Sequence, residues 1–314
     1  MVALLALAVG LAVAPSPEPR LLIEPIHENA LVGDFAAPAD GGRHPTVIII
    51  GGFEGNTGGD ATSLAIHGYS AFALAYFGGP SLPRSADQIP VELVSRAIDW
   101  VLVRPEVDPA RISILGISQG SQLALLAAAR ERRIRSVAVI SPSAYVWFSP
   151  AFDGERDRSS WSLNAAGLPF IPPDKRAEAV LGQTYQSGGT YAFRELYDAS
   201  LAAAAPATVA AATIPVDRIA VPILCIAGDD DRQWDSAGAC KTIAARRRGL
   251  PAAASDEEAI EPGAGHVNWL AGRPTPDVIP AGRMKLRMGG STAANTRAAA
   301  DAWSRVLTFF SRRS

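Results

Sequence analysis

Two patterns of hydrophobic residues alternate along the chain. Residues 46–52 form a continuous run of β-branched side chains closed by two glycines, which is typical of a strand buried on both faces of a sheet. Residues 91–103 instead repeat apolar side chains at helical spacing, with Leu93, Ala97 and Val101 on one face. Strands that alternate with helices in this way predict an α/β fold, with a mainly parallel sheet covered by helices on both faces.

The same two patterns assign most of the chain. We predict strands at residues 21–27, 31–37, 46–52, 70–77, 111–117, 136–140, 221–227 and 259–260. We predict helices at residues 91–103, 119–133, 236–248 and 293–310. With 314 residues, the chain is long enough to form one large α/β domain, which we assign to residues 15–314.

One long interval, residues 144–215, separates two core strands and carries several aromatic side chains. In an open α/β sheet, ligands bind beyond the carboxyl ends of the strands, so we expect this insertion to form a cap that shapes a substrate pocket. Trp147, Trp161 and Phe170 are its candidate substrate-binding residues. The alternative is a structural excursion with a small core of its own.

The candidate nucleophile is Ser118, within a G-x-S-x-G sequence that starts at Gly116 and ends at Gly120. The motif follows a predicted strand and opens a predicted helix, which is the context of a nucleophile elbow. The glycines permit a tight turn that lifts the hydroxyl above the sheet edge, and the helix N-terminus offers N–H groups to a developing oxyanion. The alternative is an ordinary turn bounded by glycines.

A serine hydroxyl needs a neighbouring base to become nucleophilic. Of the four histidines, His266 alone follows Ser118, and the order expected for this elbow is serine, acid, histidine. Three consecutive aspartates stand after a core strand between the two. Asp231 is the candidate acid, because the chain must turn away from the strand before a carboxylate can face the histidine. Asp230 is the second candidate, and we expect Asp229 to form the turn.

Backbone N–H groups supply the candidate oxyanion hole. One comes from Gln119, and the other from Phe53 or, as the alternative, Gly52, in a glycine-rich loop that lets the backbone approach a substrate closely. That loop lacks the glycine and lysine spacing of a phosphate-binding loop. The predicted reaction is acyl transfer to Ser118 followed by hydrolysis, which requires no metal and no cofactor.

Charge and cysteine content narrow the partners. A formal net charge of −2 argues against a nucleic-acid partner, which would require a clustered basic face. The two cysteines, Cys225 in a predicted strand and Cys240 in a predicted helix, form neither a C-x-x-C pair nor a zinc site. The sequence leaves their pairing open, and we expect buried free thiols. No feature of the sequence specifies an oligomer.

The first fourteen residues are apolar and then give way to a polar, proline-containing segment. This segment is too short to span a bilayer. It is similar to a secretory signal with Ala12-Val13-Ala14 as its cleavage site, although no basic residue precedes Arg20. We therefore expect export to the periplasm or the extracellular space, with a cytoplasmic protein that has an apolar N-terminal arm as the alternative.

Roughly residues 45–312 resemble the C-terminal catalytic domain shared by acyl-CoA thioesterases and bile acid-CoA:amino acid N-acyltransferases, within the α/β-hydrolase superfamily. The segments that carry the resemblance are GISQGS at 116–121, SSWSLNAAGLPFIP at 159–172, GDDDRQWDS at 228–236, GAGH at 263–266 and GGSTAANTRAAADAW at 289–303. The segment at 159–172 and the tryptophan that follows the aspartates are more specific than the G-x-S-x-G motif.

This resemblance implies the same three side chains as the residue patterns. The family's nucleophile falls on Ser118, its base on His266, and its acid, three residues before a tryptophan, on Asp231. By this resemblance, the acyltransferase members of the family use cysteine as the nucleophile, whereas the thioesterases use serine. Ser118 therefore implies hydrolysis. Full-length thioesterases of the family carry an N-terminal β-sandwich domain, whereas about thirty residues lie here between the apolar segment and the first buried strand.

These observations together predict a serine hydrolase that cleaves a small acyl thioester or ester through an acyl-enzyme. An exported member would meet little acyl-CoA, which makes an exported carboxylesterase the first alternative. An acyltransferase that uses an amine acceptor is the second alternative. A non-catalytic binding protein on a hydrolase scaffold is the third.

Overall fold

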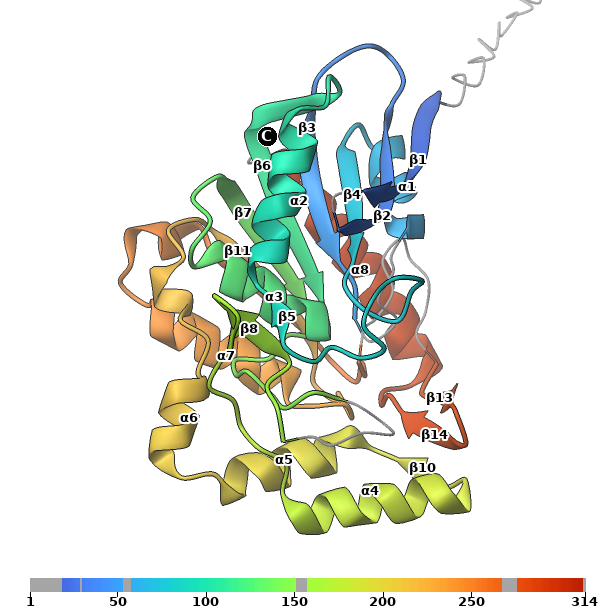
Figure 1. The fold of residues 1–314 in the computed structure, drawn as a ribbon, viewed down its shortest axis with the longest axis vertical. Helices are drawn as coiled ribbons and strands as arrows, with labels where there is room; N and C mark the ends of the chain where they lie inside the picture. Colours follow the sequence, from blue (N-terminus) through green and yellow to red (C-terminus); the bar gives the residue numbers. More distant parts are fainter. Residues whose placement is uncertain (1–18, 29, 53–57, 151–156, 267–275, 313–314) are drawn as a thin grey trace, which may run out of the picture.

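A central sheet of eight strands organises the protein. The computed structural model describes residues 19–28, 30–52, 58–150, 157–266 and 276–312 (Figure 1). Within them the sheet order is β1-β2-β4-β3-β6-β7-β11-β12. The strands are β1 (Leu21–Glu28), β2 (Leu31–Pro38), β3 (His44–Ile50), β4 (Ser70–Ala75), β6 (Val107–Ile117), β7 (Ile134–Ile140), β11 (Ile223–Gly228) and β12 (Glu257–Glu261). Only the β1–β2 and β2–β4 pairs of this sheet are antiparallel, which confirms the predicted mainly parallel sheet.

Helices cover both faces of the sheet, as predicted. The alternation along β3 shows why: Ile48 and Ile50 enter one core, whereas Val47 and Ile49 enter the other. The first core lies beneath α2 (Glu92–Leu102), α3 (Gln119–Ala128) and α7 (Ser236–Arg247), and the second beneath α1 (Gly58–Ile66) and α8 (Thr292–Ser311). Helix α3 ends five residues before its predicted end at residue 133, and the other predicted helices end within two residues of the predicted positions.

The insertion at residues 144–215 lies at the lower end of the view in Figure 1. It contains β8 (Trp161–Leu163), β9 (Ala166–Gly167), α4 (Lys175–Ser187), β10 (Thr190–Tyr191), α5 (Phe193–Ala203) and α6 (Pro206–Ala212). The segment β5 (Ile89–Pro90) pairs with β8, which ties the insertion to the main body. Short 3-10 helices occur at Val216–Arg218 and Pro251–Ser255.

A hairpin that the sequence analysis did not predict joins the insertion to the C-terminal part of the chain. Its strands are β13 (Val278–Ala281) and β14 (Met284–Arg287), and β14 pairs in parallel with β10. Leu286 and Met288 from this region share a third apolar core with Phe148, Leu196 and Tyr197. The insertion therefore has a core of its own, to which the hairpin contributes.

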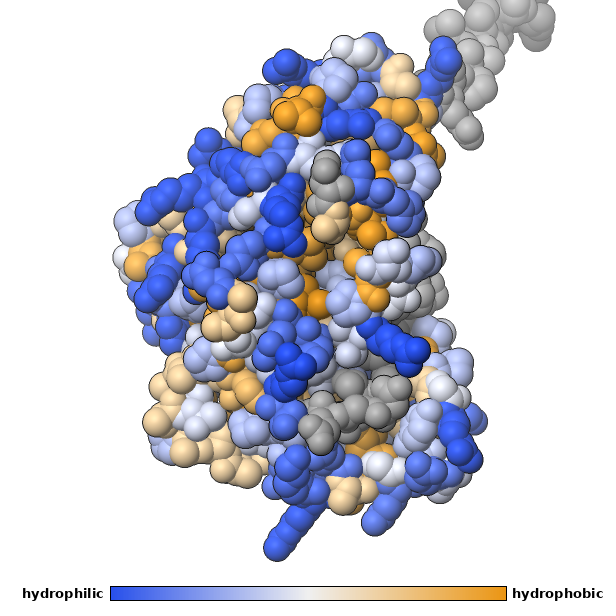
Figure 2. All heavy atoms as spheres, viewed as in Figure 1, coloured by the Kyte–Doolittle hydropathy of each residue, from blue (hydrophilic) through white to orange (hydrophobic). Residues whose placement is uncertain are grey.

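The outer surface is mixed in character. Figure 2 shows hydrophilic side chains over much of one face, with apolar side chains exposed between them. Among the helices within the described ranges, none combines the length and the apolar character that a membrane crossing requires.

Candidate active site

Ser118 occupies a strained turn between β6 and α3. Its backbone has φ 55° and ψ −124°, a conformation that non-glycine residues rarely adopt. A Cβ on Gly116 would lie 2.6 Å from the Cβ of Ala124, and a Cβ on Gly120 would lie 2.2 Å from the carbonyl oxygen of Gly51. Both glycines of the motif are therefore required by close packing around the turn, which is the arrangement expected of a nucleophile elbow.

Three side chains from distant parts of the sequence form one hydrogen-bonded chain. The Nε2 atom of His266 lies 2.7 Å from the Oγ atom of Ser118, and its Nδ1 atom lies 2.7 Å from Oδ2 of Asp231. All three residues are buried, with exposed fractions of 6% for Ser118 and 2% for each of the others. Because a carboxylate accepts but does not donate, Nδ1–H donates to Asp231, and Nε2 is left to accept the hydroxyl proton.

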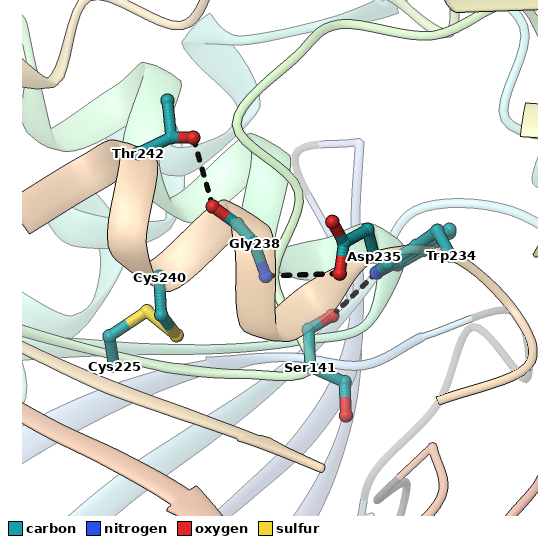
Figure 3. Close-up of a disulfide and its surroundings, with 7 residues drawn as sticks. All are labelled: Ser141, Cys225, Trp234, Asp235, Gly238, Cys240 and Thr242. Atoms are coloured by element: carbon teal, nitrogen blue, oxygen red, sulfur yellow. Dashed lines mark hydrogen bonds between the residues drawn. A yellow bond between two sulfur atoms is a disulfide. The ribbon is translucent and has the colours of Figure 1, made fainter. Parts of the chain in front are cut away.

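The loop between β11 and α7 holds the carboxylate of Asp231 in place. Oδ1 accepts hydrogen bonds from the backbone N–H groups of Gln233, at 2.7 Å, and Trp234, at 3.3 Å. The indole N–H of Trp234 donates to the carbonyl of Ser141 at 3.1 Å (Figure 3). The Trp234 ring also meets the imidazole of His266 edge-on, at a centroid distance of 5.2 Å. The backbone and this tryptophan thus fix both members of the Asp231–His266 pair.

The two neighbouring aspartates bind elsewhere. Asp229 lies in a turn after β11, as expected, but its Oδ1 accepts from the N–H of Gly263, 34 positions away, at 2.6 Å, and not from a neighbouring residue. Asp230, the second candidate for the acid, accepts from the N–H of Gly290 at 2.9 Å. Each therefore ties the acid loop to a glycine segment next to His266, which local turn propensity could not reveal.

A cavity of about 420 Å³ opens over Ser118 and His266. Its described lining is Ser118, Gln119, Pro150, Tyr185, Phe193, Tyr197, Gln233, Trp234, His266, Ile279, Pro280, Ala281, Gly282, Leu286 and Met288. The insertion and the β13–β14 hairpin supply most of the apolar part. Among these residues, no Asp, Glu, Lys or Arg is present, so the described wall suits an uncharged, largely apolar group.

The three aromatic residues that the sequence suggested for this cavity do not line it. Trp161 is fully buried, and its indole N–H donates to Oε1 of Gln122 at 3.0 Å. Trp147 donates to Oγ of Ser143 at 2.7 Å, and Phe170 packs against the apolar cores. The aromatic residues of the insertion that do line the cavity are Tyr185 on α4 and Phe193 and Tyr197 on α5. Aromatic content alone does not distinguish a core ring from a pocket ring.

The candidate oxyanion hole is only partly described. Phe53, the first choice for one N–H, lies outside the described residues, whereas Gly52 is described and buried. Tyr76, which the sequence analysis missed, donates from its hydroxyl to the carbonyls of Gly51 and Gly52, at 3.0 Å each. Fixing the Gly51 carbonyl also fixes the N–H of Gly52, because both belong to one planar peptide. Gln119, the other proposed N–H donor, is the first residue of α3 and lines the cavity.

Cys225 and Cys240 form a disulfide, so the expectation of two free thiols was wrong. The bond joins β11 to α7 across 15 positions of sequence, with the Cα atoms 5.7 Å apart (Figure 3). The packing of α7 on β11 brings the thiols together, and their spacing in the sequence gives no sign of it. The loop that carries Asp231 and Trp234 lies between the two cysteines.

Solved structures place the fold among the α/β hydrolases. The chain is similar to the α/β hydrolase GrgF from Penicillium sp. sh18, with 15% identity and a TM-score of 0.53, over 94% of this chain and 98% of that one. It is also similar to a puromycin-hydrolyzing peptidase from Mycobacterium tuberculosis, with 14% identity and a TM-score of 0.58, over 96% of this chain and 41% of that one. The chain therefore has the α/β-hydrolase fold, as predicted.

Sequence comparison gives a narrower result. Acyl-coenzyme A thioesterase 1 from Homo sapiens is 26% identical over 310 residues, which cover 93% of this chain but only 65% of the human protein. The chain thus spans slightly less than two thirds of that relative. The sequence profile of the family described as "BAAT / Acyl-CoA thioester hydrolase C terminal" matches residues 89–313. The chain accordingly belongs to the BAAT / acyl-CoA thioester hydrolase C-terminal family, as its sequence motifs implied.

Proposed function

We propose that the protein is a serine hydrolase that cleaves an acyl thioester, or an ester of the same acyl group, through an acyl-enzyme on Ser118. The observation that carries the proposal is the hydrogen-bonded chain from Ser118 through His266 to Asp231 at the floor of an apolar cavity. Membership of a family that includes acyl-CoA thioester hydrolases supports the thioester as substrate.

The proposed reaction follows from the direction of the hydrogen bonds. Nε2 of His266 takes the hydroxyl proton as Oγ of Ser118 attacks the acyl carbon, and Asp231 stabilises the imidazolium through Nδ1–H. The N–H of Gln119 and an N–H of the loop at residues 52–53 hold the oxyanion. The imidazolium then protonates the leaving thiolate or alkoxide. A water molecule, deprotonated by His266, releases the carboxylic acid and restores Ser118.

The cavity indicates which part of the substrate lies inside the protein. Its volume of about 420 Å³ is at the lower end of the range for small-molecule sites, and its described wall contains no Asp, Glu, Lys or Arg side chain. The acyl chain therefore occupies the cavity, against Phe193, Leu286 and Met288. The leaving group remains outside, where the cavity opens to solvent.

The disulfide favours export, the location expected from the sequence, over the cytoplasmic alternative. Disulfides persist in oxidising compartments and are rare where glutathione keeps thiols reduced. The Cys225–Cys240 bond and the signal-like segment at residues 1–14 independently support export to the periplasm or the extracellular space. In such a compartment, esters or thioesters other than acyl-CoA become the relevant substrates.

A labelling experiment tests the nucleophile, and a rate comparison tests the substrate. A fluorophosphonate probe should label the wild type but not Ser118→Ala, which should also lose turnover. The matched control is Ser121→Ala, three residues further along the chain in α3 and not part of the described cavity lining, which should be labelled like the wild type. Equal labelling of Ser118→Ala would overturn the proposal.

The substrate is tested by comparing the cleavage rates of acyl-CoA and aryl esters of equal chain length, with and without added glycine or taurine. Faster cleavage of the esters supports the exported esterase, and a conjugate instead of free acid supports an acyltransferase.

A further inference from the structure

Two glycine-rich backbone segments cross directly behind His266. One runs through Ala264 and Gly265 to the histidine, and the other runs from Met288 to Gly290. The N–H of His266 donates to the carbonyl of Met288 at 2.9 Å. A Cβ built on Gly265 would lie 2.2 Å from the carbonyl oxygen of Gly289, so no side chain fits between the segments. The position of the imidazole therefore depends on how these two backbones are held together.

Asn295, in the second turn of α8, spans the crossing. Its Oδ1 atom accepts from the N–H of Gly265 at 2.8 Å, and its Nδ2 atom donates to the carbonyl of Gly289 at 3.1 Å. The side chain is buried, with an exposed fraction of 2%, and does not line the cavity. One carboxamide thus binds one group of each segment, and the first of these groups belongs to the residue before His266.

We propose that Asn295 is a positioning residue for His266, which sets the distance from the imidazole to Ser118 without touching the substrate. This inference rests on the proposed function, because it assigns His266 as the base. His266 lies five positions after the end of β12 at Glu261, and its segment is paired with the Gly290 segment only by the isolated bridge from Ala264 and by its own N–H bond to Met288. Asn295 anchors this loop to α8, a long helix packed in the core beneath the sheet.

The chemistry of the contact requires a carboxamide. The N–H of Gly265 needs an acceptor and the carbonyl of Gly289 needs a donor, and a carboxamide carries the two on separate atoms of one planar group. Asn295→Ala removes both bonds and leaves two buried backbone groups without these partners. Asn295→Asp keeps the acceptor for Gly265 but sets a carboxylate oxygen against the carbonyl of Gly289. The two variants therefore weaken the link that Asn295 makes between the two segments to different degrees.

The test separates turnover from substrate binding. Asn295→Ala should lower kcat by about 10- to 100-fold, because a shift of about 1 Å in a catalytic group costs rates of this order, while KM changes by less than about threefold. The kcat of Asn295→Asp should lie between that of Asn295→Ala and that of the wild type. The far-downfield proton resonance of the Nδ1–H bond between His266 and Asp231 should weaken in the same order. Thr296→Ala, exposed on the next position of α8, is the matched control and should equal the wild type.

The outcomes are distinct. Folded Asn295→Ala and Asn295→Asp proteins with a wild-type kcat and an unchanged resonance would overturn the proposal. So would a loss confined to KM. If Asn295→Ala does not fold, Asn295→Asp decides alone by the same two measurements. Failure of the proposed function is recognised separately, because Ser118→Ala would then retain turnover whatever the Asn295 variants do.

Discussion

Replacing Asp231 by asparagine should disable His266 through its tautomer. In the wild type, Oδ1 of Asp231 accepts two backbone N–H groups, from Gln233 and Trp234, and Oδ2 accepts Nδ1–H of the imidazole. An amide has one oxygen, and the two backbone donors hold it, since the reverse orientation would leave both buried N–H groups facing an NH₂ at about 1–3 kcal/mol each. The NH₂ then faces Nδ1, which must accept. The proton moves to Nε2, where it blocks deprotonation of Ser118.

The expected loss in kcat for Asp231→Asn is about 10⁴-fold, the effect of a wrong imidazole tautomer in a serine hydrolase, which corresponds to about 5.5 kcal/mol of barrier. KM should change little, because Asp231 does not line the cavity. Initial rates of aryl-ester hydrolysis over a range of substrate concentrations separate the two constants. The substitution changes one atom, so circular dichroism and thermal unfolding should match the wild type.

Asp230→Asn provides the matched control for this substitution. The Asp230 carboxylate accepts from the N–H of Gly290 and pairs with Arg232, at the surface side of the same loop. An amide oxygen can still accept from Gly290, so we expect less than a tenfold loss in kcat. If Asp231→Asn keeps more than about a tenth of the wild-type kcat, or if both variants lose equally, the tautomer argument is wrong.

Three further predictions concern stability and specificity. Cys225→Ala combined with Cys240→Ala should lower the free energy of unfolding by about 3 kcal/mol, the value for a loop of 15 residues. Chemical denaturation of the wild type in the presence of reductant should give a free energy of unfolding close to that of the double variant. Burial and the neighbouring Asp301 raise the pKa of Glu261 from 4.5 to about 7, so its stabilising effect is complete below pH 4.5 and is lost as the pH rises through 7. Glu261→Gln should therefore gain about 1 kcal/mol over wild type at pH 8, after allowance for solvent screening, and nothing at pH 4; equal gains at both pH values would contradict this. Leu286→Trp should fill part of the cavity and slow long-chain esters more than acetyl esters, whereas equal slowing would show that the acyl chain lies elsewhere.

The sequence predicted the parts of the fold whose signals are local and strong. The β-branched run at 46–52 has no stable alternative to a buried strand, and the structure has β3 there. The G-x-S-x-G turn is likewise specified by its own glycines. The convergence of Ser118, Asp231 and His266 followed from chain order, because elements after parallel strands meet at one sheet edge.

Features that depend on pairing between distant segments were not predictable in the same way. Strands β13 and β14 are four residues long, and β14 pairs with two residues of β10, so the sequence carried only a faint alternation from Met284 to Arg287. The wall of the cavity was missed for the same reason. Trp161 was misassigned because a buried indole with an internal acceptor has the same sequence signature as a pocket ring.

The Cys225–Cys240 bond also has a consequence for the integrity of the chain. It turns residues 225–240 into a covalently closed ring that carries Asp231 and Trp234. A protease that cuts this ring once leaves two polypeptides that stay tethered, as one band on a gel without reductant and two bands with it. Each half of a nicked acid loop thus stays attached to the other through the bond between β11 and α7.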